Sequence, residues 1–502
     1  MIRKALTENG WVRGMQGTNA RITVYRGVPY AAPPVGENRW RAPQPAADWE
    51  GERACLEFAP ISMQETPGLA DNVYTLEWHV NPEIPMNEDC LYLNIWTPAK
   101  TGDEKFPVLV WFFGGGYQVG YTAEMEFDGE ALAKRGIVVV SVNYRVGAFG
   151  FMAHPELTAS QPDAPTNFGL LDQQAGVRWV QRNIAAFGGD PDKISIGGQS
   201  AGGGSVMYQI TNPENKGLIK SAIAISGMFR DPYKSAFPGN GRILSNVEQI
   251  GADFLKFLGA GSIEEGRKLD AFFIRDKYEE FRKGAMALGP CVDGVFNTDD
   301  TYKLFAEGKS LDIPLISGNT VDEFPAFISA ADEDGLKAEA ERIFGERAGE
   351  FLSFDEAHKP MGDGRFAPVS RIEPAVKHVF LESEKSGKTA PNYYYRFNED
   401  IPGYDNPGNF HSSDLWFFFD NLQKCWRPFV GRHYDLARQM ADYWVNFIKT
   451  GDPNGKGYDG EDLPAWKPYA SGAEESMVFD PRGSVPETGD TSFDRFLIET
   501  LV

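Results

Sequence analysis

Short runs of β-branched and aromatic side chains, separated by polar or glycine-rich stretches, dominate the hydrophobic pattern from residue 90 onward. Each run is much shorter than the roughly 18 apolar residues that a membrane-spanning helix needs. A short apolar run bounded by turn residues is typical of a buried strand. We therefore expect strands at residues 91–98 (LYLNIWTP), 106–113 (FPVLVWFF), 136–144 (GIVVVSVNY) and 193–198 (KISIGG).

A helical pattern lies between the last two of these strands. Residues 167–188 place apolar side chains at approximately helical spacing, and Asn167 is a candidate N-cap. A second helix is expected over residues 201–211, directly after Ser200. Because strands that alternate with helices are typical of a mostly parallel sheet covered on both faces, the sequence predicts an α/β fold.

No flexible linker, charge block or repeat divides the 502 residues, so we expect one large domain over residues 1–502. Three segments fall outside the sheet pattern, at about 65–86, 230–290 and 330–400. Connecting segments of this kind often carry specificity on a rigid scaffold. We expect them to form the rim and lid of a site.

The formal net charge of −22 bears on partners and location. A strongly acidic chain is poorly suited to phosphate backbones or anionic lipid surfaces, so nucleic acid and membrane partners are not expected. The first residues carry two cations but no apolar core of a signal peptide. We therefore expect a cytoplasmic protein.

The cysteines do not form a metal-binding or disulfide motif. They are far apart, at Cys55, Cys90, Cys291 and Cys425, with no CxxC pair and no histidine at metal-ligand spacing. Residues 452–462 resemble a calcium loop superficially, but Lys456 occupies a ligand position and Leu463 replaces the final glutamate. The sequence predicts reduced thiols and neither a metal nor an organic cofactor.

Ser200 is the strongest candidate for chemistry. It lies between the strand at 193–198 and the following helix, in Gly198-Gln199-Ser200-Ala201-Gly202. Small residues on both sides permit the sharp strand-to-helix turn of a nucleophile elbow, which exposes the serine oxygen at the edge of a sheet. The pentapeptide predicts a nucleophilic serine if a base and oxyanion donors are also present.

Those partners are available elsewhere in the chain. Three glycines follow the strand at 106–113, so their backbone can approach a ligand and offer N–H donors. Of the six histidines, His411 lies in a polar loop before an aromatic run (NPGNFHSSDLWFFF), whereas the others lack accompanying catalytic signals. Asp322 and Glu323 follow a predicted strand between Ser200 and His411, and either is a candidate for the orienting acid.

At this point the sequence resembles the type-B carboxylesterases and cholinesterase-like members of the α/β-hydrolase fold. The resemblance extends over almost the whole chain. The matching motifs are YRGVPYAAPPVGENRWRAPQP, NEDCLYLNIWTPA, NFGLLDQQAGVRWVQRNIAAFGGDP, the elbow, PCVDGVF, GNTVDEFPAF, HSSDLWFFF and FIKTGDPN.

The resemblance implies a role for each matching residue. Ser200 corresponds to the nucleophile, His411 to the general base and acid, and Glu323 to the carboxylate that orients the imidazole. The oxyanion donors correspond to the backbone N–H groups of Gly115, Gly116 and Ala201. Gln199 stands where the family often has Glu, and Ser226 corresponds to a serine that supports the acid. Arg39 and Glu88 correspond to a structural ion pair. The family's disulfide partner of Cys90 corresponds to Ser62, so this bond is not expected.

The implied function is hydrolysis of small-molecule carboxylic esters through an acyl-enzyme intermediate. Many aromatic residues lie near the site elements, which suggests aryl or cinnamoyl-type esters. These are Phe112, Phe113, Tyr117, Phe324, Phe327, Trp416, Phe417, Phe418 and Phe419. The alternatives are an amidase, lactonase or lipase that uses the same triad, or a binding module that keeps the fold without the chemistry.

Overall fold

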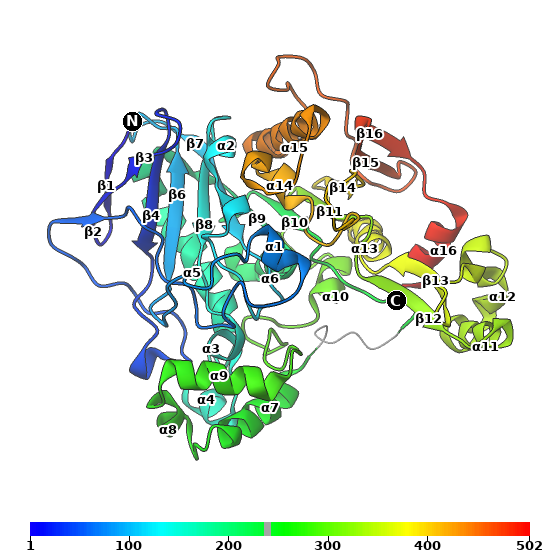
Figure 1. Cartoon of the computed structure of the whole chain (residues 1–502), viewed down its shortest axis with the longest axis horizontal. Helices are drawn as coiled ribbons and strands as arrows, with labels where there is room; N and C mark the ends of the chain where they lie inside the picture. The colour runs from blue at the N-terminus through cyan, green and yellow to red at the C-terminus, as the bar shows by residue number, and fades with distance from the viewer. Residues whose placement is uncertain (235–241, 502) are drawn as a thin grey trace.

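The computed structural model describes residues 1–234 and 242–501, and a central sheet runs through most of its width (Figure 1). Within these residues the sheet has eleven strands. In spatial order they are β16 (Gly483–Thr488), β15 (Glu475–Asp480), β14 (Asn392–Phe397), β11 (Leu315–Thr320), β10 (Ser221–Ile225), β9 (Gly189–Gln199), β7 (Phe106–Phe112), β8 (Val138–Val142), β6 (Tyr92–Thr97), β4 (Thr23–Pro29) and β3 (Met15–Gln16).

The strands from β15 to β8 pair in parallel, and antiparallel strands complete both edges. The mostly parallel sheet expected from the sequence is therefore confirmed, and the four strands expected first correspond to β6, β7, β8 and β9. Two smaller sheets contain β1 (Lys4–Thr7), β2 (Gly10–Arg13) and β5 (Glu52–Ala54), and β12 (Pro325–Ser329) with β13 (Arg365–Ser370).

Helices surround the sheet, and the expected ones correspond to α5 and α6. The helices are α1 (Val73–Glu77), α2 (Glu130–Ala133), α3 (Gly147–Phe151), α4 (Pro155–Ser160), α5 (Phe168–Asn183), α6 (Ala201–Thr211), α7 (Leu244–Phe257), α8 (Ile263–Arg267), α9 (Ala271–Arg282), α10 (Thr301–Ala306), α11 (Glu333–Phe344), α12 (Ala348–Phe351), α13 (Glu373–Lys385), α14 (Leu415–Phe418), α15 (Gly431–Thr450) and α16 (Ser492–Thr500). Within the residues described, none is long and apolar enough to cross a membrane.

Both faces of the sheet are covered because successive side chains of a strand point to opposite sides. On one face of β9, a Cβ at Gly198 would lie 2.4 Å from the α6 backbone. On the other face, Gly197 leaves room for the ring of Trp111, which packs 4.9 Å from Phe418 of α14. The α/β-hydrolase fold expected from the resemblance is thus present.

Asn167 does not cap α5 with its side chain, contrary to the expectation. Its backbone adopts a left-handed conformation with φ of 56°. The side chain instead bonds across the fold, donating to the Cys291 carbonyl and to Asp293 and accepting the Cys291 N–H. A tertiary contact more than a hundred residues away has replaced the local cap.

The three segments predicted to form a rim and lid differ in structure. Residues 65–86 contain α1, and residues 230–290 contain α7, α8 and α9, which form a group at one end of the molecule in Figure 1; residues 235–241 of this range lie outside the described residues. Residues 330–400 contain α11 and α12, but β14 at their end is a strand of the central sheet and α13 packs on it. The last part of that range therefore belongs to the sheet and its cover.

Two further expectations concern buried side chains. Arg39 and Glu88 form the expected ion pair, with 2.6 Å between Nη2 and Oε2. All four cysteines are free thiols, and Cys90 lies beside Ser62.

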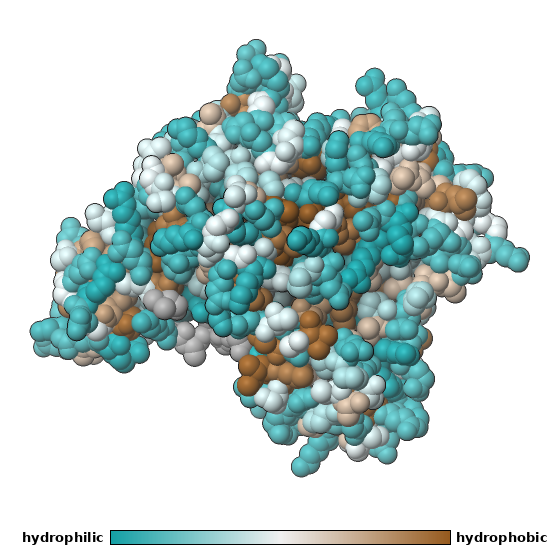
Figure 2. Space-filling model, turned by 180° about the vertical axis from the view of Figure 1, so that it is seen from behind, coloured by the Kyte–Doolittle hydropathy of each residue, from teal (hydrophilic) through white to brown (hydrophobic). Residues whose placement is uncertain are grey.

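Polar residues cover most of the rear face of the molecule, while apolar residues gather near its middle (Figure 2).

Candidate active site

Ser200 lies in a strained turn between β9 and α6. Its φ of 57° and ψ of −123° are uncommon for a residue with a side chain. The neighbouring backbones are very close, because a Cβ at Gly202 would lie 2.1 Å from the Phe112 carbonyl oxygen. The Ser200 N–H donates to the Ile225 carbonyl at 2.9 Å. Glycine and these contacts hold the serine at the carboxyl ends of the parallel strands.

His411 and Glu323 are joined directly. The imidazole Nδ1 lies 2.6 Å from Glu323 Oε2, and both side chains are buried. The other oxygen, Oε1, accepts the Ser226 hydroxyl at 2.5 Å and the Thr320 N–H at 3.3 Å. Asp322, the alternative acid, instead accepts the Asn409 N–H at 2.7 Å. Glu323 therefore contacts the ring, whereas Asp322 fixes the loop that precedes it.

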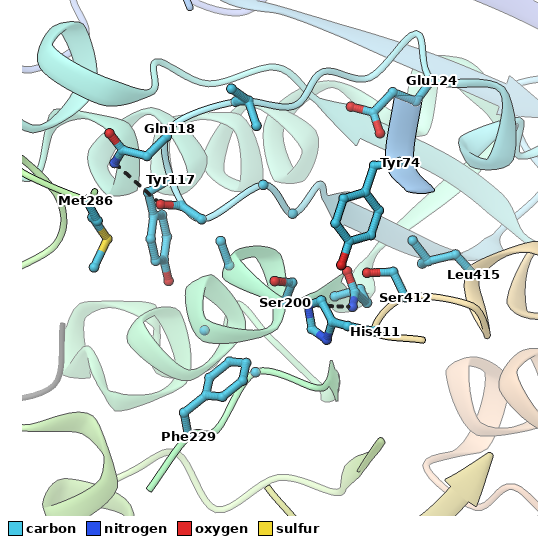
Figure 3. A pocket seen from close by; sticks show the side chains of 18 of the residues that line it. Tyr74, Tyr117, Gln118, Glu124, Ser200, Phe229, Met286, His411, Ser412 and Leu415 are labelled. Atoms are coloured by element: carbon cyan, nitrogen blue, oxygen red, sulfur yellow. Dashed lines mark hydrogen bonds between the residues drawn. The ribbon is translucent and has the colours of Figure 1, made fainter. Parts of the chain in front are cut away.

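The second imidazole nitrogen faces Gln199. His411 Nε2 lies 3.3 Å from Gln199 Nε2, so the amide donates to it when the ring carries its proton on Nδ1. Ser200 and His411 face the same cavity (Figure 3). Among the described residues no hydrogen bond joins Ser200 Oγ to His411. The structure thus brings the three predicted triad residues together, with Gln199 at the nitrogen that faces the serine.

The predicted oxyanion donors also line this cavity. Gly115 and Gly116 have φ of 105° and 61°, and a Cβ at Gly115 would lie 2.2 Å from a backbone carbonyl oxygen. Among the hydrogen bonds of the described chain, none is donated by the N–H of Gly115, Gly116 or Ala201. The loop is supported at Phe113, whose ring stacks 4.1 Å from Tyr144 and whose carbonyl accepts the Tyr144 hydroxyl.

The cavity has a volume of about 630 Å³. Of the nine aromatic residues suggested from the sequence, Tyr117 and Phe324 line it; the other seven do not, and all of these except Phe327 are buried in the core. Tyr74, Trp78, Phe127, Tyr208, Phe229, Met286 and Leu415 provide much of the remaining wall. Apolar and aromatic groups therefore dominate the space around Ser200.

Two carboxyl groups, Glu124 and Glu126, line this cavity, whereas no Lys or Arg is among its described lining residues. Glu126 is fully buried, and burial together with the neighbouring Glu124 carboxylate raises its pKa well above the usual range. Glu124 accepts the Tyr121 N–H and lies 3.5 Å from His79. Burial alone would lower the pKa of His79, but Glu124 outweighs it and the pKa is raised. His79, which the sequence left without a role, thus belongs to the cavity wall.

A buried ion network fixes the wall that α1 provides. The Glu77 carboxylate accepts from Arg427 at 2.6 and 2.7 Å and from the indoles of Trp416 and Trp426 at 3.0 and 3.3 Å. Arg427 also pairs with Asp405 at 2.9 Å. The segment that carries Tyr74 and Trp78 is therefore tied to the segments that flank His411.

Sequence reasoning missed Glu77, Glu126 and Asp414 as members of this site. Asp414 follows His411 by three residues, is fully buried, and accepts the Tyr395 hydroxyl at 2.7 Å. Its place inside the HSSDLWFFF motif was the one available signal. No group of three or more His, Cys, Asp or Glu residues arranged to hold a metal ion occurs in the described part of the chain.

Comparison with known proteins agrees with this geometry. The model of the carboxylesterase family matches residues 3–386 and 372–493. The chain is 32% identical over 493 residues to para-nitrobenzyl esterase of Bacillus subtilis, covering 94% of each protein, and 32% identical over 471 residues to fumonisin B1 esterase of Sphingopyxis macrogoltabida, covering 89% of this chain and 82% of that one.

Solved structures give the same result. A structure of PNB esterase superposes with a TM-score of 0.80 at 27% identity, covering 99% of both chains. Carboxylesterase EST55 of Geobacillus stearothermophilus gives 0.76 at 29% identity, covering 99% of this chain and all of the other. The chain belongs to the carboxylesterase family of the α/β-hydrolase fold, and it is a carboxylic ester hydrolase of the serine hydrolase type.

Proposed function

We propose that the protein hydrolyses small-molecule carboxylic esters through an acyl-enzyme on Ser200. His411 serves as general base and acid, and Glu323 holds the imidazole and stabilises its charged form. The single observation that carries the proposal is the 2.6 Å bond between His411 Nδ1 and Glu323, at a cavity that also contains the strained Ser200. This bond favours Glu323 over Asp322 as the working acid.

The reaction begins when the Ser200 hydroxyl replaces the Gln199 amide at His411 Nε2. Ser200 Oγ attacks the ester carbonyl as Nε2 takes its proton, and the N–H groups of Gly115, Gly116 and Ala201 stabilise the oxyanion. His411 then gives the proton to the departing alcohol. Water attacks the acyl-enzyme with the same assistance and releases the carboxylic acid.

The cavity favours apolar substrates, aryl or cinnamoyl-type esters among them. Its volume suits a ligand of moderate size, and its walls are largely aromatic and apolar. We propose that residues 65–86 and the α7–α9 group form its rim within a single domain. A cytoplasmic location and the lack of nucleic acid or membrane partners stay predictions from composition and charge.

The test is the release of p-nitrophenol from p-nitrophenyl acetate by the wild type and by Ser200→Ala. We expect a burst and then turnover in the wild type, and a loss of at least about a thousandfold in the variant. Ser205→Ala is the matched control, because that buried hydroxyl bonds within α6 and to Gln173. p-Nitroacetanilide, the amide counterpart, tests for amidase activity. An inert wild type or a fully active Ser200→Ala variant would refute the proposal.

A further inference from the structure

Two tyrosines meet on the wall of the cavity that is formed by the helix after Ser200. Tyr208 lies on α6 and Tyr117 directly follows Gly116, and both line the cavity. Their ring centroids are 6.5 Å apart, with an interplanar angle of 67°. A Cβ at Gly204 would lie 2.5 Å from the Tyr117 hydroxyl oxygen, so this hydroxyl rests directly on α6. The two phenol rings therefore share one part of the wall.

The hydroxyl of Tyr208 is free to bind a ligand. Within the described part of the chain, it neither donates nor accepts a hydrogen bond, whereas the Tyr117 hydroxyl has Ser205 as a partner. Burial raises the pKa of Tyr208 well above its usual range and outweighs the opposing effect of Arg242. The phenol thus keeps its proton and can donate it to a hydrogen-bond acceptor.

Thr301 adds a third uncharged hydroxyl to this region. It is the first residue of α10, which packs on α6, and it lines the same cavity. Among the hydrogen bonds of the described residues, none involves its hydroxyl. Neighbouring lining residues such as Met286 and Pro290 are apolar. This wall therefore offers hydrogen bonds without charge in largely apolar surroundings, which suits a neutral polar group.

The reaction decides which half of an ester reaches this wall. His411 gives its proton to the departing alcohol, so the alcohol half lies on the His411 side of Ser200. Tyr117 and Met286 lie on the opposite side of Ser200 (Figure 3). Tyr208 is two helical turns beyond Ser200, a rise of about 12 Å, and helix side chains lean back toward the N-terminal end. The acyl half therefore extends along α6 toward the hydroxyl groups.

We propose that Tyr208, with Thr301 and Tyr117 beside it, forms a polar subsite that selects acyl chains carrying a neutral oxygen, such as an ether, several bonds from the scissile carbonyl. A hydrocarbon chain would cover the same hydroxyls without pairing them, which costs binding free energy. This inference rests on the proposed function, because it uses the position of the leaving alcohol relative to His411. It makes Tyr208 a residue that contacts substrate and sets specificity.

The test compares p-nitrophenyl esters whose acyl chains have equal length and differ in one atom. The heptanoate is the hydrocarbon, and the 5-methoxypentanoate and 4-ethoxybutanoate each replace one methylene by an ether oxygen. The leaving group is the same in all three, so differences in kcat/KM report the acyl half. Rates of hydrolysis by hydroxide correct for intrinsic reactivity. The selectivity is the corrected kcat/KM of the better ether ester divided by that of the heptanoate.

Tyr208→Phe removes one hydroxyl and keeps the ring. We expect it to lower the selectivity by about three- to tenfold, the effect of one hydrogen bond, while the heptanoate is hydrolysed at least as well as by the wild type. Tyr74→Phe is the matched control, because it removes a hydroxyl from the same cavity on the His411 side (Figure 3). It should keep the wild-type selectivity.

Three results would overturn the proposal. If Tyr208→Phe keeps the wild-type selectivity, its hydroxyl does not bind the acyl chain. If it lowers kcat/KM for the ether ester and the heptanoate equally, Tyr208 merely supports the cavity wall. If Tyr74→Phe lowers the selectivity as much, the ether oxygen lies on the other side of Ser200. A wild type that hydrolyses neither p-nitrophenyl acetate nor the longer esters would instead refute the esterase mechanism on which the proposal rests.

Discussion

Asp414 should make the stability of this protein depend on pH in a way that one substitution can isolate. Burial raises the pKa of Asp414 to about 7, with the Tyr395 hydroxyl and His411 opposing and Glu323 adding to the rise. In the unfolded chain the carboxyl has its ordinary pKa of 3.8. Between these values the folded state holds a proton that the unfolded state has lost. The contribution of Asp414 to the free energy of unfolding is therefore fully present below about pH 4 and is lost as the pH rises toward 7.

The magnitude follows from the two pKa values. A separation from 3.8 to about 7 corresponds to about 4 kcal/mol of unfolding free energy in total. About 2–3 kcal/mol of this falls between pH 5 and pH 8, because only the part above pH 5 is sampled. Asp414→Asn keeps an oxygen for the Tyr395 hydroxyl but has no proton to lose. Its unfolding free energy should lack this component.

The assay is urea unfolding of the wild type and Asp414→Asn at pH 5 and pH 8. Other groups titrate in both proteins, so the quantity of interest is the difference between the two pH dependences. Asp71→Asn, at an exposed position, is the control and should follow the wild type. If the wild type and Asp414→Asn lose equal stability between the two pH values, Asp414 is ionised in the folded protein and the reasoning fails.

Three further predictions follow from the packing of the site. Gly202→Ala should abolish p-nitrophenyl acetate hydrolysis and lower the free energy of unfolding in urea by about 2–4 kcal/mol, because the new Cβ would lie 2.1 Å from a main-chain oxygen. Gly349→Ala is the control and should be tolerated, because its Cβ would meet open space. Glu77→Gln should lower the free energy of unfolding by about 2–4 kcal/mol, because the buried Arg427 guanidinium would keep Asp405 as its one charged partner. It should also raise KM for benzyl esters more than KM for ethyl acetate. Equal changes in the two KM values would contradict a role of Glu77 in shaping the cavity wall. Ser226→Ala removes a charge-assisted hydrogen bond to Glu323, so kcat/KM for p-nitrophenyl acetate should fall about tenfold while KM changes little. Unchanged kinetics would show that this hydrogen bond does not support Glu323.

Local signals in the sequence were sufficient for the sheet and for the elbow. The runs that became β7 and β9 are apolar because both faces of these strands are buried, so their pattern was unambiguous. Gly198 and Gly202 are required by close backbone contact around Ser200, which is itself a local feature. His411 and Glu323 could be selected only from the motifs that surround them. Their contact across 88 residues is formed by the fold.

What the sequence did not reveal depends on contacts made only in the folded chain. Asn167 is a residue type that often caps helices, but its side chain forms hydrogen bonds with the backbone of Cys291 instead. Glu77 is an ordinary polar residue in its local sequence and becomes buried because Arg427, 350 residues later, supplies its counter-charge. The contact between Gln199 and His411 likewise depends on how the end of β9 meets a loop that lies 212 residues later. No local sequence pattern indicates that a single charged side chain will be buried.

The apolar lining of the cavity has a consequence for how the products depart. Burial and Glu124 raise the pKa of Glu126, which disfavours its charged form, and Glu124 lies 3.5 Å from His79. Among the described lining residues there is no Lys or Arg to hold an anion. Hydrolysis turns a neutral ester into a carboxylate inside this largely apolar space, where a charge loses the solvation that it has in water. We therefore expect the acid product to leave readily and to inhibit weakly, and esters that already carry a carboxylate to be poor substrates.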